Sequence, residues 1–178
     1  MERKHLMIKI DGIISEKEIK SEIEVNYYVS LKFRTQSNSI EGARYMYIEH
    51  SNQSMIEFIL PLNSMALKGF SILLIKKRLY QTLRGPDNFF VGIPIFAMPE
   101  GKVFSGGTGR EYMKLDADLG AFIGLNFIEI IINNYKQFDT SIQCGDVQFL
   151  LWNYCLAGIK VLNRSKEDLE IFAQHLKE

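Results

Sequence analysis

A glycine-rich segment at residues 105–110 is the first stretch whose composition suits binding chemistry. It reads Ser-Gly-Gly-Thr-Gly-Arg. Clustered glycines leave backbone N–H groups free to surround an anion, and the arginine adds positive charge. A Walker loop needs Lys and then Ser or Thr after its last glycine, whereas Arg and Glu follow here. A surface loop is therefore the simpler interpretation. The alternative is a site for a phosphorylated or nucleotide substrate, formed by Gly106, Gly107, Gly109 and Arg110.

Asp116 and Asp118 form an acid-x-acid pair of the kind that holds a divalent metal on nucleotide substrates. Hard cations bind several oxygen ligands, and no third acid is close in the sequence. Asp118 is also well placed to cap a following helix, because its carboxylate can accept backbone N–H groups. We favour the capping role and expect neither a metal nor a cofactor.

The only cluster of charges of one sign consists of Lys76, Lys77, Arg78 and Arg84. Lys77 and Arg84 are seven residues apart and would share one face of a helix. Such a face can contact an acidic protein surface or a nucleic-acid backbone. The structural alternative is a solvated helix end. These four residues are the predicted partner-binding site.

The histidines and cysteines show no catalytic or metal-ligand spacing. None of His5, His50 and His175 has a metal-ligand spacing or a plausible catalytic nucleophile beside it, and Cys144 and Cys155 form no CxxC motif. A Cys–His pair assembled in space is the alternative that the sequence leaves open. The sequence therefore favours a protein that is not an enzyme.

Length, charge and cysteine content limit the class of protein. The 178 residues suffice for one globular domain, residues 1–178, and 47% of them are hydrophobic. Lys and Arg together number 21, as do Asp and Glu, which argues against a general nucleic-acid binder. Two cysteines suggest a reducing compartment. The first ten residues contain no continuous apolar segment of the signal-peptide type, so we expect a cytoplasmic protein.

Four helices are predicted. The central one spans 118–138, because Asn126, Glu129, Asn133 and Lys136 recur at steps of three and four along a very apolar stretch. A helix buried on several sides is favoured over a membrane span, which would contain fewer polar residues. The glycines at 120 and 124 would let another backbone approach closely. The other predicted helices span 64–84, 147–157 and 165–176. Residues 159–162 are either a short last strand or a continuation of the helix before them.

Strand signals dominate the first third of the chain. Residues 21–34 alternate between apolar and polar side chains and predict one long antiparallel strand. Strands at 43–49 and 55–62 would continue an antiparallel meander, with shorter strands at 6–10 and 89–98. The predicted fold class is α+β, a mainly antiparallel sheet of about five strands packed on one side by three to four helices.

The function that remains is a non-catalytic protein-binding module. Its most concrete form is a bacterial immunity-type protein that neutralises a toxin by stoichiometric binding. The alternative is an enzyme or ligand-binding domain that uses the glycine-rich segment 105–110 for a phosphorylated or nucleotide substrate. A protein partner is expected, nucleic acid is disfavoured, no membrane association is expected, and a homo-oligomer through an open strand edge is an alternative.

Overall fold

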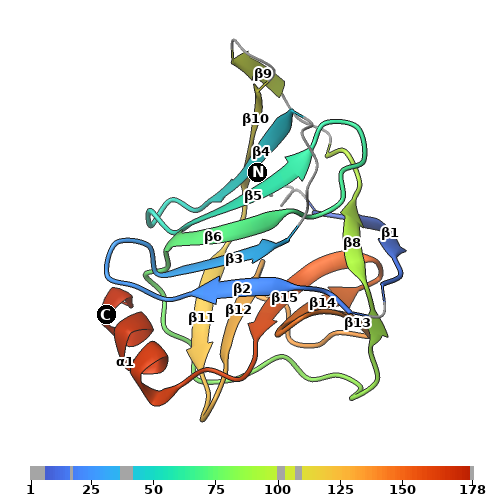
Figure 1. Cartoon of the computed structure of the whole chain (residues 1–178). Coiled ribbons are helices and arrows are strands. Elements are labelled where there is room, and N and C mark those ends of the chain that lie inside the picture. The colour runs from blue at the N-terminus through green and yellow to red at the C-terminus, as the bar shows by residue number, and fades with distance from the viewer. Residues whose placement is uncertain (1–6, 17, 37–41, 100–102, 107–109, 177–178) are drawn as a thin grey trace.

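The protein consists of two facing β-sheets, a small third sheet and one helix (Figure 1). The computed structural model describes residues 7–16, 18–36, 42–99, 103–106 and 110–176, with only the backbone described at 103–106. Fifteen strands and one helix lie in these ranges. The α+β prediction with three to four helices is therefore wrong, because most of the predicted helices are strands.

The larger sheet has seven strands in the order β2-β3-β6-β5-β4-β10-β9. Its strands are β2 (Ser21–Glu24), β3 (Leu31–Thr35), β4 (Ala43–Glu49), β5 (Met55–Pro61), β6 (Gly69–Leu74), β9 (Val103–Gly106) and β10 (Arg110–Asp116). All neighbours are antiparallel except β4 and β10. The carboxyl ends of these two parallel strands consequently lie together, with Glu49 opposite Asp116.

The second sheet has six strands in the order β11-β12-β15-β14-β13-β7. Its strands are β7 (Phe90–Val91), β11 (Leu119–Ile123), β12 (Ile128–Ile132), β13 (Thr140–Cys144), β14 (Val147–Trp152) and β15 (Cys155–Val161). The third sheet pairs β1 (Ile10–Ile14) with β8 (Ile93–Phe96). The segment predicted as one irregular strand at 89–98 therefore contributes to two sheets.

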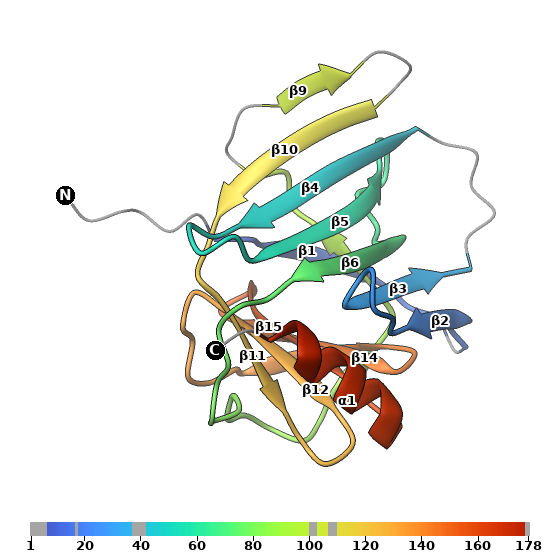
Figure 2. The same ribbon diagram turned by 90° about the vertical axis from the view of Figure 1, so that its left-hand side faces the viewer.

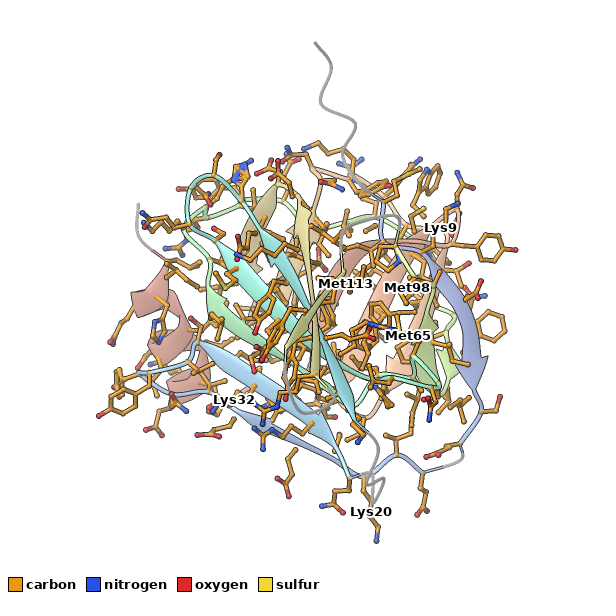
Figure 3. The ribbon with its side chains drawn as sticks, turned by 90° about the horizontal axis from the view of Figure 1, so that it is seen from above. Lys9, Lys20, Lys32, Met65, Met98 and Met113 are labelled. Carbon is orange, nitrogen blue, oxygen red and sulfur yellow. The ribbon has the colours of Figure 1, made fainter. Side chains whose placement is uncertain are left out.

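The main core fills the space between the two large sheets, which form two layers in Figure 2. Phe70 of β6 meets Phe149 of β14 edge to face, with ring centroids 6.1 Å apart. Phe58 packs on both Phe70 and Phe96. Met113 of β10 is fully buried and lies near the centre of the molecule in Figure 3. Alternate residues of each strand thus supply one apolar face to a shared core.

The predicted central helix is an antiparallel hairpin of β11 and β12. Ile128, Ile130 and Ile132 enter the main core, while Glu129 and Ile131 are buried on the opposite face of the sheet. A strand buried on both faces shows a continuous apolar run instead of alternation. The polar residues of this segment therefore recur at a helical spacing by coincidence.

The predicted helices at 64–84 and 147–157 are wrong for similar reasons. Residues 69–74 form β6, and the basic residues that follow form no helix. Residues 147–157 form the β14–β15 hairpin, whose turn residues Asn153 and Tyr154 have φ of 49° and 62°. Two positive φ values suit the right-handed twist of a two-residue hairpin. An Asn followed by a residue other than Gly concealed that turn in the sequence.

The predicted long strand at 21–34 is two strands, β2 and β3, paired antiparallel. The side-chain oxygen of Asn26 accepts hydrogen bonds from the N–H groups of Tyr28 at 2.9 Å and Val29 at 2.8 Å. This local turn interrupts an alternation that continues through it in the sequence. The strands predicted at 43–49 and 55–62 are confirmed as β4 and β5.

The last predicted helix is confirmed as α1 (Lys166–His175), which lies beside the sandwich in Figure 2. Its Phe172 is fully buried, and the Ser165 hydroxyl oxygen accepts the Asp168 N–H at 3.0 Å.

Among the described residues, no helix is long and apolar enough to cross a membrane.

Replacing Ser165 with alanine is expected to lower the free energy of unfolding by about 1 kcal/mol, because the Asp168 N–H loses its acceptor. Urea denaturation measures this change. Ser165→Asp is the matched control, since aspartate also accepts at this position and should restore wild-type stability.

Candidate functional site

Residues 75–89, which we call the strap, cross from β6 to β7 without forming a helix or a long strand. In Figure 1 the strap is the light-green chain that descends beside β11 and passes below the six-stranded sheet. Leu79 N–H donates to the Ala121 carbonyl at 2.7 Å, and Ala121 N–H donates to the Lys77 carbonyl at 2.8 Å. Arg84 N–H also donates to the Lys136 carbonyl at 3.1 Å. The backbone of the strap is therefore fixed at both ends.

Glycines allow the strap to lie directly against the sheet. A Cβ at Gly158 would be 2.8 Å from Cδ1 of Leu83, and a Cβ at Gly120 would be 2.8 Å from the Leu79 side chain. The atoms closest to a Cβ at Gly120 belong to the Leu79 side chain of the strap and not, as the sequence had suggested, to another backbone. Leu83 is buried here in a second apolar cluster, separate from the main core. This cluster consists of Leu83, Ile131, Leu150 and Ala157, with Leu79, Tyr135, Phe138 and Trp152 packed against it.

Glu129 connects the strap to the middle of the sheet. Its side chain is 1% exposed, and its Oε1 accepts the N–H of Leu83 at 2.6 Å. Lys160 Nζ lies 4.0 Å from Oε2 and 4.2 Å from the centre of the Phe127 ring. Burial raises the pKa of Glu129, although the Leu83 N–H and the charge of Lys160 both act to lower it. The residue is thus a structural anchor for the strap.

The strap and the turn after β12 enclose a groove of about 540 Å³. We call it the strap groove, and its lining consists of Leu79, Tyr80, Gln81, Thr82, Arg84, Ile131, Asn134, Tyr135, Lys136 and Gln137. This lining contains two cations and no carboxylate. The Tyr80 side chain is 80% exposed. The groove therefore offers aromatic rings, amides and positive charge on a fixed backbone.

The structure separates the members of the predicted basic site. Lys76 Nζ donates to Gln53 at 2.5 Å, and Lys77 Nζ binds Asp118 and Asn134 at 3.0 Å each. The side chains of Arg78 and Arg84 are exposed, and neither has a hydrogen-bond or ion-pair partner among the described residues. Because the segment forms no helix, the argument from a shared helical face is wrong. Arg84 lines the strap groove instead.

Asp118 lies in a polar cluster and caps no helix, so the capping prediction is wrong. Its carboxylate accepts hydrogen bonds from Lys77 and Asn134, and His50 Nε2 lies 3.6 Å from Oδ1. Burial acts to raise the pKa of Asp118, but hydrogen bonding and charge from Lys77, with Asn134 and His50, lower it below its usual value. Asp118 is thus ionised and paired.

Asp116 does not join Asp118 in a metal site. It is exposed and lines a separate hollow of about 370 Å³ at the carboxyl ends of β4 and β10, beside Glu49 and His50. Within the described ranges, no three His, Cys, Asp or Glu residues are grouped so that they could hold a metal ion. The acid-x-acid pattern therefore corresponds to two different environments.

The glycine-rich segment belongs to the β9–β10 hairpin at one edge of the larger sheet. Gly106 pairs with Arg110, whose side chain is exposed. Gly107 and Gly109 lie outside the described residues, so anion binding at this segment stays a prediction. Neither of the two hollows above includes Gly106 or Arg110.

The cysteines are buried as free thiols. Burial raises the pKa of Cys144 to about 12 and also raises the pKa of Cys155. A thiol is a nucleophile only as the thiolate, so neither residue is prepared for catalysis at neutral pH. His50 contacts Asp118, and His175 lies 2.9 Å from the Asn26 carbonyl oxygen. His5 lies outside the described residues.

No model of a known protein family matches the chain, and no curated protein matches it. The structure itself shows a mainly β protein of two facing sheets, with a groove on the outer side of one sheet.

The residues that sequence reasoning missed come from two distant segments. Tyr80 and Gln81 lie on the strap, whereas Asn134 and Lys136 follow β12. The available signal was the pair Asn133-Asn134, since asparagine tolerates positive φ and these residues have φ of 53° and 55°. A turn placed there would have ended the predicted central helix and directed attention to the exposed residues around it.

Proposed function

We propose that the protein is a non-catalytic protein-binding module and that the strap groove is its binding surface. One observation carries this proposal: Tyr80, 80% exposed, lines a groove on a segment whose backbone is fixed at both ends. Tyrosine is enriched among the residues that dominate binding energy at protein interfaces. A fixed backbone lowers the entropy cost of ordering that side chain on binding.

The chemistry of the groove supports binding without catalysis. Its volume is typical of ligand sites, which occupy about 300 to 1,000 Å³. Its lining contains no histidine, cysteine or carboxylate, which are the groups that most often transfer protons in enzymes.

No described residue favours toxin neutralisation, and Gly106 and Arg110, the described members of the glycine-rich site, line neither of the two hollows. We propose a cytoplasmic location, which the two free thiols support, since reducing compartments keep thiols unpaired.

Replacing Tyr80 with alanine is expected to weaken the partner complex at least tenfold, because an interface anchor is removed without disturbing the core. The tagged protein is used to capture its partner from cells of its source organism, and native mass spectrometry gives the stoichiometry. Tyr28→Ala is the matched control, since Tyr28 is 94% exposed in the connection between β2 and β3. Equal capture by both variants would exclude the strap groove as the binding surface.

A further inference from the structure

The cations around the strap groove lack the carboxylate partners that several other described cations of the protein have. Arg44 pairs with Glu111, Lys77 with Asp118, and Arg164 with Asp146 and Asp168. In contrast, the side chains of Arg78, Arg84 and Lys136 have no carboxylate partner among the described residues. Arg84 and Lys136 are also adjacent, because the Arg84 N–H donates to the Lys136 carbonyl. The groove therefore presents uncompensated positive charge.

The strap also has free backbone donors beside these cations. The N–H groups of Tyr80, Gln81 and Thr82 make no hydrogen bond to any residue that the structure describes. All three residues line the groove, together with the amide side chain of Gln137. Free backbone N–H groups can pair with the carbonyl groups of an extended peptide. A peptide chain thus fits this surface better than an isolated small anion, which would use the charge alone.

Building on the proposed function, we infer that the strap groove binds an acidic, extended peptide segment of the partner protein. Arg84 and Lys136 pair with carboxylates of that segment. Arginine suits this role because its planar guanidinium can hold a carboxylate through two hydrogen bonds. Tyr80 packs against the peptide between the peptide's charged side chains, and the free N–H groups of the strap donate hydrogen bonds to the peptide's carbonyl oxygens.

The balance of charge favours a peptide over a nucleic acid. The protein has a net charge of zero, whereas nucleic-acid binding domains usually carry a basic excess along the path of the backbone. Non-specific binding of single strands also uses several aromatic rings on which successive bases stack. Tyr80 and Tyr135 are the only aromatic residues among those that line the strap groove.

A fluorescein-labelled octapeptide with glutamate at every second position is the probe for this inference, and fluorescence anisotropy is the readout. Wild-type protein is expected to bind it, and binding is expected to weaken with rising salt because the contacts are ionic. The double variant Arg84→Glu with Lys136→Glu should weaken binding at least tenfold, since two attractions become repulsions. The same peptide with lysine in place of glutamate should not bind.

A charge-matched variant separates the local effect from the change in net charge. Lys20→Glu with Lys166→Glu alters the net charge equally, at two exposed sites that do not line the groove; Lys20 lies at the periphery in Figure 3. This variant should bind the acidic peptide like the wild type. Equal weakening in both double variants would overturn the inference, as would tighter binding of a labelled single-stranded oligonucleotide than of the peptide.

The outcomes also distinguish this inference from the proposed function. If the partner is still captured through Tyr80 but the acidic peptide does not bind, the partner's chemistry is wrongly assigned and the function stands. If the peptide binds at Arg84 and Lys136 but no protein is captured, the proposed function fails while the groove's preference for acidic peptides is retained.

Discussion

Replacing Gly158 with valine is expected to lower the free energy of unfolding by about 3 kcal/mol, near the upper end for overpacking a buried site. A Cβ at this position would lie 2.7 Å from the Ile130 carbonyl oxygen and 2.8 Å from Cδ1 of Leu83. The first of these atoms is backbone of the adjacent strand, so a rotamer change cannot relieve the contact. The second belongs to the strap, so valine must also displace Leu83 from the sheet.

Urea denaturation measures the stability change, and amide hydrogen exchange at Leu83 reports the displacement of the strap. Gly12→Val is the matched control, because a Cβ at Gly12 meets only Cδ1 of Ile95, at an ordinary 3.6 Å. A Gly158→Val protein with wild-type stability and unchanged protection at Leu83 would show that the strap does not lie against β15.

Local signals explain which parts of the fold the sequence predicted. Strands β4 and β5 alternate cleanly because one face is buried and the other is open. Helix α1 was found because its cap and its apolar stripe are both encoded within a dozen residues. Each of these elements can be predicted from its own residues alone.

The central helix is wrongly predicted because a second layer covers the sheet at β12. The strap buries the outer face of β12, so that strand is apolar on both sides and resembles a buried helix. Only the three-dimensional path of the strap explains this, because the covering residue Leu83 is far from Ile131 in the sequence. Of the predicted basic cluster only Arg84 lines the strap groove, and Lys136 and Tyr80 could not be joined to it before the strap was placed.

Replacing Glu129 with alanine is expected to lower the free energy of unfolding by about 3 kcal/mol. The change leaves the N–H of Leu83 buried without an acceptor and removes the carboxylate near Lys160. Glu129→Gln is the informative comparison, since its amide oxygen can still accept the Leu83 N–H. Its stability at neutral pH should remain much closer to that of the wild type.

The pH dependence of Glu129→Gln tests the electrostatic part of this account. Burial raises the pKa of Glu129 in the folded protein above its unfolded value, so the folded state binds this proton more tightly. The contribution of Glu129 to stability is therefore greatest below the unfolded pKa and falls as pH rises through the folded pKa. Glutamine does not titrate, so the stability of Glu129→Gln relative to the wild type should increase from about pH 4 towards about pH 8.

The contribution of Asp118 to stability changes with pH in the opposite direction. Its pKa is lowered in the folded protein, so this contribution is lost as pH falls through the folded pKa. Both proteins contain Asp118, so its effect cancels in the difference between their urea midpoints at each pH. A difference that stays constant over this range would mean that Glu129 does not titrate differently in the folded and unfolded states. In that case Glu129 would be ionised in the folded protein, with the charge of Lys160 and the Leu83 N–H fully offsetting the cost of burying its carboxylate.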